Sequence, residues 1–356
     1  MSYGFLNPIP KPSSIIDKPK KHQYPMKLDF KKFRNIPVID CHVHLWKLRN
    51  SVTPELIQEQ GTALTEAIKH SGIDAMHIFS RGDHTPLTLK KQASGRFYAG
   101  GYAPWSGDTE SFKVADWDQY IESLIQLGYD GIGEMGSKTV LRARHTPLDS
   151  DYYAGFWAAC ENQGFPVLCH IGDVEDFWYE DKTPQWAKDR NWGYYNGDYP
   201  HLTELYTEIQ NILGEHPDLK ITLCHFLFMS PNMEQADQFL TDYPNACLDL
   251  SLGVELMYNI SRRRDDYRDF FRKHDDRILF GTDIGMSTTL PQHLARIWLI
   301  RNFLETSEQF YTVPEADDLL TRYTEPYIGL DLPGNSLKKI YAQNFKHMWG
   351  EKPRET

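Results

Sequence analysis

Short apolar runs alternate with longer amphipathic stretches along the chain from residue 36 onward. Eight runs have the length and composition of buried β-strands: 36–46, 72–80, 96–104, 129–136, 165–173, 219–228, 246–253 and 277–285. Apolar residues recur at helical spacing in most of the intervals: 53–70, 116–127, 150–163, 201–216, 232–243 and 291–305. The interval 81–95 shows little helical pattern. Alternating strands and helices require a parallel sheet, and eight such units predict an α/β fold, the (β/α)8 TIM barrel.

Segments at both ends of the chain extend this barrel. Residues 1–35 are rich in Pro and Lys and lack periodicity, so we expect an extended N-terminal arm that lies on the body or bridges to another subunit. A partly ordered tail fits the same pattern. We expect residues 36–350 to form a single barrel domain. Near its end, Pro333 and Gly334 precede apolar residues at helical spacing, which predicts a C-terminal helix that closes the barrel.

The connection at residues 174–200 is long and crowded with aromatic residues. It follows the fifth strand, at the face of a barrel where loops often close over an active site. Four of its rings could form an apolar lid over a ring or sugar of the substrate: Trp178, Trp192, Tyr194 and Tyr195. A surface insertion packed by its own aromatic residues would have the same composition.

Composition narrows the class of protein and its partners. The 356-residue chain carries a net charge of −11, which repels phosphate backbones, so we expect a small-molecule substrate and no nucleic acid. Its five cysteines are widely spaced and form no CxxC pair, which fits a reducing compartment. We find no signal peptide and no run of about 18 apolar residues, so we expect no membrane partner and a cytoplasmic location. Barrels of this size commonly dimerise, so a homo-oligomer is consistent with the sequence.

Polar residues with nitrogen or carboxylate donors stand at the carboxyl ends of five predicted strands. In "IDCHVHLW", residues 39–46, His42 and His44 are two positions apart and so face the same side of a strand. Four further donors end later strands: Glu134, His170, His225 and Asp283. The carboxyl ends of barrel strands meet at one mouth, where six such donors would bind a divalent metal, most simply zinc. Each residue alone could have an ordinary structural role, but six at one end favour a single site.

Three cysteines immediately precede proposed histidine ligands: Cys41, Cys169 and Cys224. If the histidines point into the barrel, strand alternation turns the preceding residues outward, towards the helices. We therefore expect these cysteines to act as small buried apolar side chains and not as metal ligands.

The motifs at these strand ends resemble the amidohydrolase superfamily, and specifically its amidohydrolase-related (amidohydrolase 2) branch of metal-dependent barrel hydrolases. The resemblance rests on "DCHVHLW", "CHIGD", "LCHF", "LFGTDIG" and the tail "LPGNSLKKIYAQNFKHMWG", and it spans residues 36–350. It implies a barrel with one or two divalent ions per chain at the carboxyl-terminal mouth.

The resemblance also implies a role for individual residues. His42 and His44 would bind the deeper metal, and Asp283 would complete that set and act as proton shuttle. His170 would be a further ligand. His225 would be either a ligand of a second metal or a catalytic residue beside a single one.

The branches of the superfamily differ in metal number and in reaction. Glu134 matches a glutamate that joins two metals in members similar to deoxyribonuclease-like hydrolases, whereas members that decarboxylate aromatic or muconate-type acids resemble mononuclear enzymes. Our main hypothesis is a metal-dependent hydrolase of an amide, ester or lactone bond in a small molecule, acting through a metal-bound hydroxide with Asp283 as proton shuttle. The alternatives are a non-oxidative decarboxylase of a small unsaturated or aromatic acid, a phosphoester hydrolase, and a catalytically silent binding barrel.

Substrate contacts are expected from residues that follow the strands at the mouth. Arg81, after the second strand, could bind a carboxylate through its two-pronged guanidinium. Trp105 follows the third strand, Glu255 follows the seventh, and Trp192 and Tyr194 belong to the aromatic connection. Each of these residues could equally be an ordinary surface or packing residue.

Overall fold

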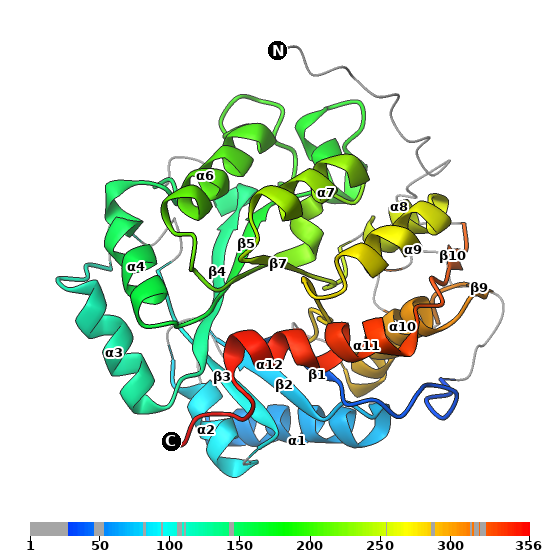
Figure 1. Ribbon diagram of the computed structural model, residues 1–356, viewed down its shortest axis with the longest axis horizontal. Helices are drawn as coiled ribbons and strands as arrows, with labels where there is room; N and C mark the ends of the chain where they lie inside the picture. Colours follow the sequence, from blue (N-terminus) through cyan, green and yellow to red (C-terminus); the bar gives the residue numbers. More distant parts are fainter. Residues whose placement is uncertain are drawn as a thin grey trace.

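The computed structural model of this protein describes residues 28–45, 53–80, 83–93, 95–104, 109, 112–141, 146–253, 255–285, 289–313, 315–316, 320 and 325–356. Eight parallel strands form one sheet in chain order, with helices around it (Figure 1). They are β1 Ile39–His44, β2 Ala75–Phe79, β3 Phe97–Gly101, β4 Gly131–Lys138, β5 Val167–Gly172, β6 Ile221–Leu223, β7 Ala246–Asp249 and β8 Ile278–Leu279. The N–H groups of Cys41 and His44 donate to the carbonyls of Phe280 (2.9 Å) and Ile284 (2.8 Å), which joins β1 to the segment that continues β8. The sheet thereby closes on itself, and the predicted TIM barrel is confirmed.

Six helices lie where the sequence predicts them, and their caps explain several of their ends. They are α1 Pro54–Ser71, α3 Trp117–Leu127, α4 Asp151–Asn162, α6 Leu202–Glu215, α7 Met233–Asp242 and α10 Leu290–Glu305. The side chains of Thr53 and Asp116 accept backbone N–H bonds at the starts of α1 and α3. Gly72 and Gly128 follow these two helices with left-handed backbone, which glycine adopts without strain.

One helix that the sequence pattern does not predict, α2 Thr85–Gln92, connects β2 to β3. Its buried face includes Lys90, whose ammonium donates to Asp130 Oδ2 (2.7 Å) and to the carbonyl of Gly128 (2.6 Å). A lysine on the buried face interrupts the apolar periodicity, and this is why the interval 81–95 lacks a helical pattern. Further elements in the described part of the chain are α5 Gln185–Lys188, α8 Leu256–Arg262, α9 Arg264–Lys273, α11 Gly334–Lys338, α12 Asn344–Trp349 and the antiparallel pair β9 Gln309–Phe310 and β10 Tyr327–Ile328.

Strand β1 carries one extra residue relative to its neighbour. Three steps along β1, from Asp40 to Val43, match two steps along β2. Such a β-bulge reverses the alternation of side chains beyond it. Cys41 packs in the apolar cluster inside the barrel, Val43 packs on the helix side, and His42 between them also faces inward.

Strand β4 has the same irregularity, since the three steps from Ile132 to Met135 match two steps along β5. Ile132 and Met135 both pack on the helix side of the sheet. The two residues between them, Gly133 and Glu134, therefore both face the interior. A regular strand would have turned one of the two towards the helices.

The C-terminal segment covers the amino-terminal end of the barrel (Figure 1). It consists of α11, a π-helical turn at Lys339–Gln343, and α12. Phe345 and Trp349 of α12 pack in the interior cluster with Ile39 and Ala75, which begin their strands. The predicted closing helix is confirmed, and it forms the floor of the barrel at the end opposite the mouth.

Part of the N-terminal arm lies within the described residues. Phe33 is buried and packs against Trp298 of α10, with 6.5 Å between the ring centroids. Residues 1–27 lie outside the described residues, so the course of the arm and the domain organisation stay predictions. Among the described helices, none combines the length and the apolar character needed to cross a bilayer.

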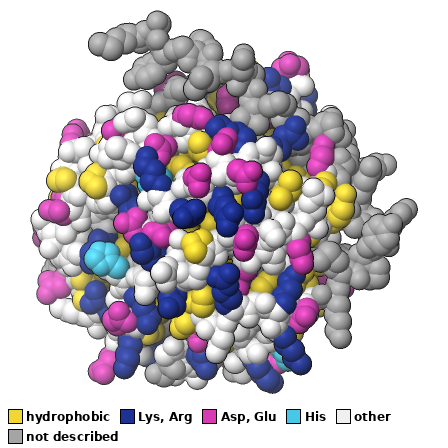
Figure 2. Space-filling view, turned by 45° about the vertical axis from the view of Figure 1, so that its right-hand side comes forward, with side chains coloured by type: hydrophobic (Ala, Val, Ile, Leu, Met, Phe, Trp, Pro, Cys, Tyr) yellow, Lys and Arg dark blue, Asp and Glu magenta, His cyan; other side chains and the backbone are white. Residues whose placement is uncertain are grey.

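Charges of both signs are interspersed on the face of the molecule drawn in Figure 2. Near α9, Arg263 pairs with Glu234 (2.7 Å) and Arg268 with Asp331 (3.5 Å). Basic side chains that are already paired with acids produce little field of a single sign. This arrangement is typical of a solvated helix surface.

Candidate metal centre

Four of the predicted donors converge inside the barrel. His44 Nε2 lies 3.1 Å from His42 Nε2 and 3.1 Å from Asp283 Oδ1. Asp283 Oδ1 is 3.7 Å from His42 Nε2, and the Glu134 carboxylate is 3.7 Å from His44 Nε2 and 4.0 Å from His42 Nε2. Donor atoms around a tetrahedral zinc ion stand about 3.3 Å apart, because each lies roughly 2.0–2.1 Å from the ion. These separations fit donors that share one divalent cation.

The other two predicted residues, His170 and His225, lie beside these four donors. His170 Nδ1 is 2.7 Å from Glu134 Oε1, and the ring centroid of His170 is 4.7 Å from that of His225. A ring nitrogen of His225 lies within 4.8 Å of donor atoms of His42 and Glu134. His170 Nε2 is buried and has no hydrogen-bond partner among the described residues, so it is a donor that a cation would satisfy. The structure brings all six predicted residues together, and their role as ligands or catalytic groups stays a prediction.

Irregular backbone delivers most of these side chains to the interior. The bulges in β1 and β4 turn three of the donors inward. His225 and Asp283 lie just beyond β6 and β8, where both adopt left-handed backbone with φ of 56° and 55°. Of the six residues, His170 alone sits on an unbroken stretch of strand, in β5. Non-glycine residues rarely adopt positive φ, and such conformations cluster at functional sites.

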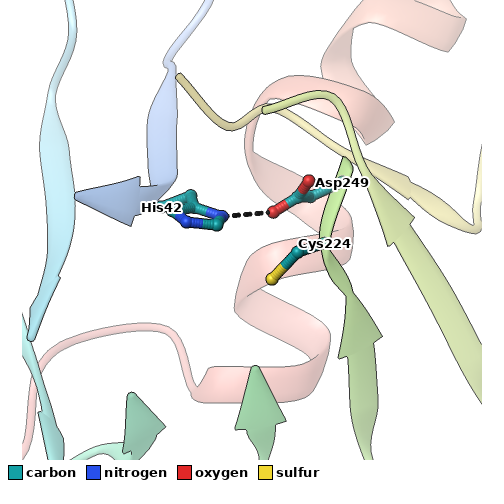
Figure 3. Close-up of side chains that lie close together, drawn as sticks. All are labelled: His42, Cys224 and Asp249. Atoms are coloured by element: carbon teal, nitrogen blue, oxygen red, sulfur yellow. Dashed lines mark hydrogen bonds and ion pairs between the residues drawn. The ribbon is translucent and has the colours of Figure 1, made fainter. Parts of the chain in front are cut away.

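The expectation that the cysteines before the histidines point outward is wrong for two of the three. Cys41 and Cys224 belong to the interior cluster, whereas Cys169 packs on the helix side of β5. The bulge in β1 and the left-handed turn after β6 each place two consecutive residues inside, and Figure 3 shows the Cys224 thiol beside His42 and Asp249. Burial raises the pKa of both interior thiols well above its usual value, which favours the neutral thiol over the thiolate that ligates metals.

Asp249, at the end of β7, is a residue that the sequence interpretation misses. Its Oδ2 accepts a hydrogen bond from Nδ1 of His42 at 2.8 Å (Figure 3). This bond leaves Nε2 of the same ring to face the other donors. The sequence does carry a signal, because a carboxylate within the buried run "ACLDLSLG" requires a partner.

Arg296 of α10 is a second residue that the sequence interpretation misses. Its guanidinium donates to the carbonyls of Thr282 and Asp283, each at 3.0 Å, and lies 3.5 Å from the Asp283 carboxylate. The Thr282 hydroxyl in turn donates to Asp40. These contacts fix the left-handed segment that presents Asp283 to the cluster.

Electrostatics in the cluster separate ionised from neutral groups. Burial lowers the pKa of His225 to about 4, and the nearby His170 adds to the effect, so the His225 ring is neutral at pH 7. Burial works against ionisation of Glu134 and Asp283, but the adjacent imidazoles hold the pKa of both carboxyls well below its usual range. Burial also opposes protonation of His42, yet Asp249 raises its pKa to about 9. Ionised carboxylates among imidazoles are the donor set that a divalent cation prefers.

The structure describes only some of the residues that are predicted to contact substrate at the mouth. Arg81 and Trp105 lie outside the described residues. Tyr194 is buried and its hydroxyl donates to Asp173 Oδ2 at 2.8 Å. The Trp192 ring stands 3.7 Å from the ammonium of Lys138, at the end of β4. These contacts tie the aromatic connection to β4 and β5, and a direct contact with substrate stays a prediction.

Comparison with known proteins agrees with this fold. A provisionally assigned amidohydrolase from Staphylococcus aureus is 14% identical, with 88% of this chain and 100% of that chain covered and a TM-score of 0.53. An uncharacterised TIM-barrel protein from Bordetella bronchiseptica is also 14% identical, with 88% and 98% covered and a TM-score of 0.51. At this identity both structures show the fold alone.

Sequence comparison supplies the assignment. No curated protein matches the chain significantly. The amidohydrolase family model matches residues 39–321, a span that begins with β1 and contains all six residues of the cluster. The match covers well over half of the chain, so this protein belongs to the amidohydrolase family.

Proposed function

We propose that this protein is a metal-dependent hydrolase that cleaves an amide, ester or lactone bond of a small molecule. The observation that carries the proposal is the convergence of Nε2 of His42, Nε2 of His44 and the Asp283 carboxylate within 3.1–3.7 Å of one another. Membership of the amidohydrolase family supports the same chemistry.

The donors divide into a core set and an outer set. His42, His44 and Asp283 would hold the first metal ion, for which we propose zinc because imidazole and carboxylate suit it. Glu134, His170 and His225 would complete that site or hold a second ion. A divalent ion bound here would polarise the scissile carbonyl and lower the pKa of water at the site.

The protein's own groups would move the proton and orient the substrate. Asp283 would accept a proton from the attacking water and return it to the leaving group, since Arg296 fixes its carboxylate in place. His225 is neutral and can accept a hydrogen bond from water or substrate through a ring nitrogen. The aromatic connection would exclude water from the mouth.

A non-oxidative decarboxylase could use the same donors. Its substrate would be a small unsaturated or aromatic acid, and Asp283 or His225 would deliver a proton to carbon. The direct contact between Glu134 and His170 favours this alternative in one respect, because it occupies a carboxylate oxygen that would otherwise join two ions. The two reactions differ in metal number and in product, so both are measurable.

The first experiment is elemental analysis of metal in the purified protein. We expect one or two ions per wild-type chain and a loss of at least one ion in His44→Ala. The control is His70→Ala, which removes an exposed histidine of α1 and should leave the metal content unchanged. A folded wild-type protein that binds no divalent metal under any loading condition would contradict the proposal.

Glu134→Gln then separates the two reactions. Two ions in the wild type and one in the variant would indicate a shared carboxylate, and we would expect turnover of esters, lactones or amides. One ion in both would place Glu134 outside the ligand set. In that case release of carbon dioxide from unsaturated acids, without hydrolysis of any ester, lactone or amide, would replace the hydrolase by the decarboxylase.

A further inference from the structure

We infer that Asp249 of β7 is a positioning residue that fixes the tautomers of two imidazoles in the metal centre, His42 and His225. This inference rests on the proposed function, since it concerns how the chain presents its ring nitrogens to a metal. β7 provides none of the six proposed ligands. Its last residue, Asp249, nevertheless accepts hydrogen bonds from His42, from the backbone of His225 and from Ser251. Asp249 is fully buried, and the Cys41 thiol also lies 3.9 Å from its Oδ2.

The contact with His42 is direct. Asp249 Oδ2 is 2.8 Å from His42 Nδ1, and the carboxylate points at the edge of the ring (Figure 3). A carboxylate only accepts, so in the neutral ring Nδ1 carries the proton and Nε2 keeps its lone pair. Nε2 is the atom that lies 3.1 Å from His44 Nε2. The bond therefore presents the donor atom to the cluster and holds the plane of the ring.

The contact with His225 runs through Ser251. Asp249 Oδ1 accepts the backbone N–H groups of His225 (2.7 Å) and Ser251 (3.0 Å), and it also accepts the Ser251 hydroxyl. Because the single hydroxyl proton of Ser251 points to Asp249, its oxygen can only accept from His225 Nδ1, which lies 3.0 Å away. The carbonyl of Ser251, at 3.2 Å from the same nitrogen, also only accepts. His225 therefore carries its proton on Nδ1 and keeps the lone pair of Nε2.

Two backbone N–H groups distinguish the two carboxylate oxygens of Asp249. Oδ1 receives the N–H groups of His225 and Ser251, and Oδ2 receives His42. In Asp249→Asn the amide oxygen must therefore take the Oδ1 position, and the NH₂ group must face His42 Nδ1. Two donors cannot share that position, so His42 should move its proton to Nε2, whereas His225 should keep its proton on Nδ1.

The test uses the full-length chain stripped of metal by chelation, with histidine nitrogens labelled with ¹⁵N, at a pH above 9, where the His42 ring is neutral and carries a single proton. Long-range ¹H–¹⁵N spectra report which ring nitrogen carries the proton, and single His→Gln variants assign the signals. We expect Nδ1–H for both rings in the wild type, and Nε2–H for His42 alone in Asp249→Asn. Zinc affinity, measured by competition with a chromogenic chelator, should fall by about 10–100-fold in the variant.

The matched control is Cys224→Ala, which changes the third buried side chain of Figure 3 and forms no hydrogen bond to either imidazole. It should keep both tautomers, and its zinc affinity should stay within about threefold of the wild type. An equal loss of affinity in Cys224→Ala and Asp249→Asn would overturn the inference, because any disturbance of this region would then have the same effect.

Two other results would also overturn it: Nε2–H on His42 in the wild-type protein, or unchanged zinc affinity in a folded Asp249→Asn. The wild-type spectrum decides the question even when the variant does not fold. The proposed function fails separately, if the wild-type chain binds no metal. Equal zinc affinity of the wild type and Asp249→Asn refutes the positioning role alone.

Discussion

Single residues in this protein carry conformations and charges that their neighbours impose. Asp283 adopts a left-handed backbone, and the next glycine, Gly285, has φ of 106° with no room for a Cβ, which would lie 1.8 Å from the His44 carbonyl oxygen. The motif "GTDIG" locates these residues in the sequence. It does not reveal that Arg296, a residue of a later helix, holds the turn in place.

Glu255, at the start of α8, is a buried acid outside the cluster of six candidate ligands. Its side chain is 4% exposed, and Oε2 has no hydrogen-bond partner among the described residues. Burial, together with the nearby charges of Asp173 and Asp176, raises its pKa from 4.5 to about 8. The folded protein therefore retains a proton at neutral pH that the unfolded chain releases.

Glu255→Gln should reveal this proton as a change in the pH dependence of stability. Because the folded pKa is raised, the wild type loses stability as pH rises from about 4.5 to about 8, by up to about 1.4 kcal/mol per pH unit. The amide cannot ionise, so the variant should gain stability relative to the wild type across this window. Urea unfolding at pH 5, 7 and 9 measures the difference. The exposed Glu59→Gln serves as control, and a difference that is flat with pH for both variants would contradict the prediction.

Elements of the barrel are predictable from periodicity to within a few residues, but their irregularities are not. The six predicted helices appear where the apolar spacing places them, because that spacing reflects the face that each helix buries. The bulges in β1 and β4 depend on the register with the neighbouring strand, which leaves no trace in a single strand's own pattern. This is why Cys41 is wrongly placed and His42 is rightly placed, although the two are adjacent.

Two glycines on β3 and β4 make room beneath the imidazoles. A Cβ on Gly100 would lie 2.6 Å from the Cα of Gly133 and 2.8 Å from the Cβ of Phe79. The ring of Phe79 in turn packs 4.6 Å from His44 and 5.5 Å from His42, between centroids. These small residues allow an aromatic ring to support the candidate metal centre from inside the barrel.

Gly100→Ala should therefore destabilise the protein by about 1–3 kcal/mol, the usual cost of overpacking a well-filled interior. The control is Gly214→Ala in α6, where a new Cβ meets nothing within 4 Å and should add up to about 1 kcal/mol of stability. Denaturation midpoints in urea compare the two variants. If Gly100→Ala proved as stable as the wild type, the close packing inside β3 and β4 would be wrong.

The molecule as a whole follows from the sequence more directly than its parts do. Eight strand–helix units, the mouth at the carboxyl ends and the closing helix are all consequences of apolar pattern. The substrate contacts are the least predictable feature, since they depend on connections such as 174–200, whose course no periodicity fixes. Asp249 and Arg296 could be suspected as charged residues in buried runs, but their partners come from other strands and helices.

Trp349→Ala should cost about 3–5 kcal/mol, as is usual for removing a large aromatic side chain from a core. The ring is 3% exposed, stacks on Phe345 at 5.5 Å and lies 4.1 Å from His77, between centroids. Thermal unfolding measures the loss. Leu127→Ala, at a leucine that is 47% exposed at the end of α3, is the control and should change little. A small effect of Trp349→Ala would show that the floor contributes little to holding the barrel together.

The floor of the barrel also constrains how the protein is made. Because α12 follows all eight strands in chain order, a growing polypeptide assembles the walls before it can seal them, and Ile39 and Ala75 remain uncovered during that interval. Nascent chains expose apolar surface of this kind to chaperones and to other chains. Docking of α12 thus ends this exposure of the barrel interior to aggregation.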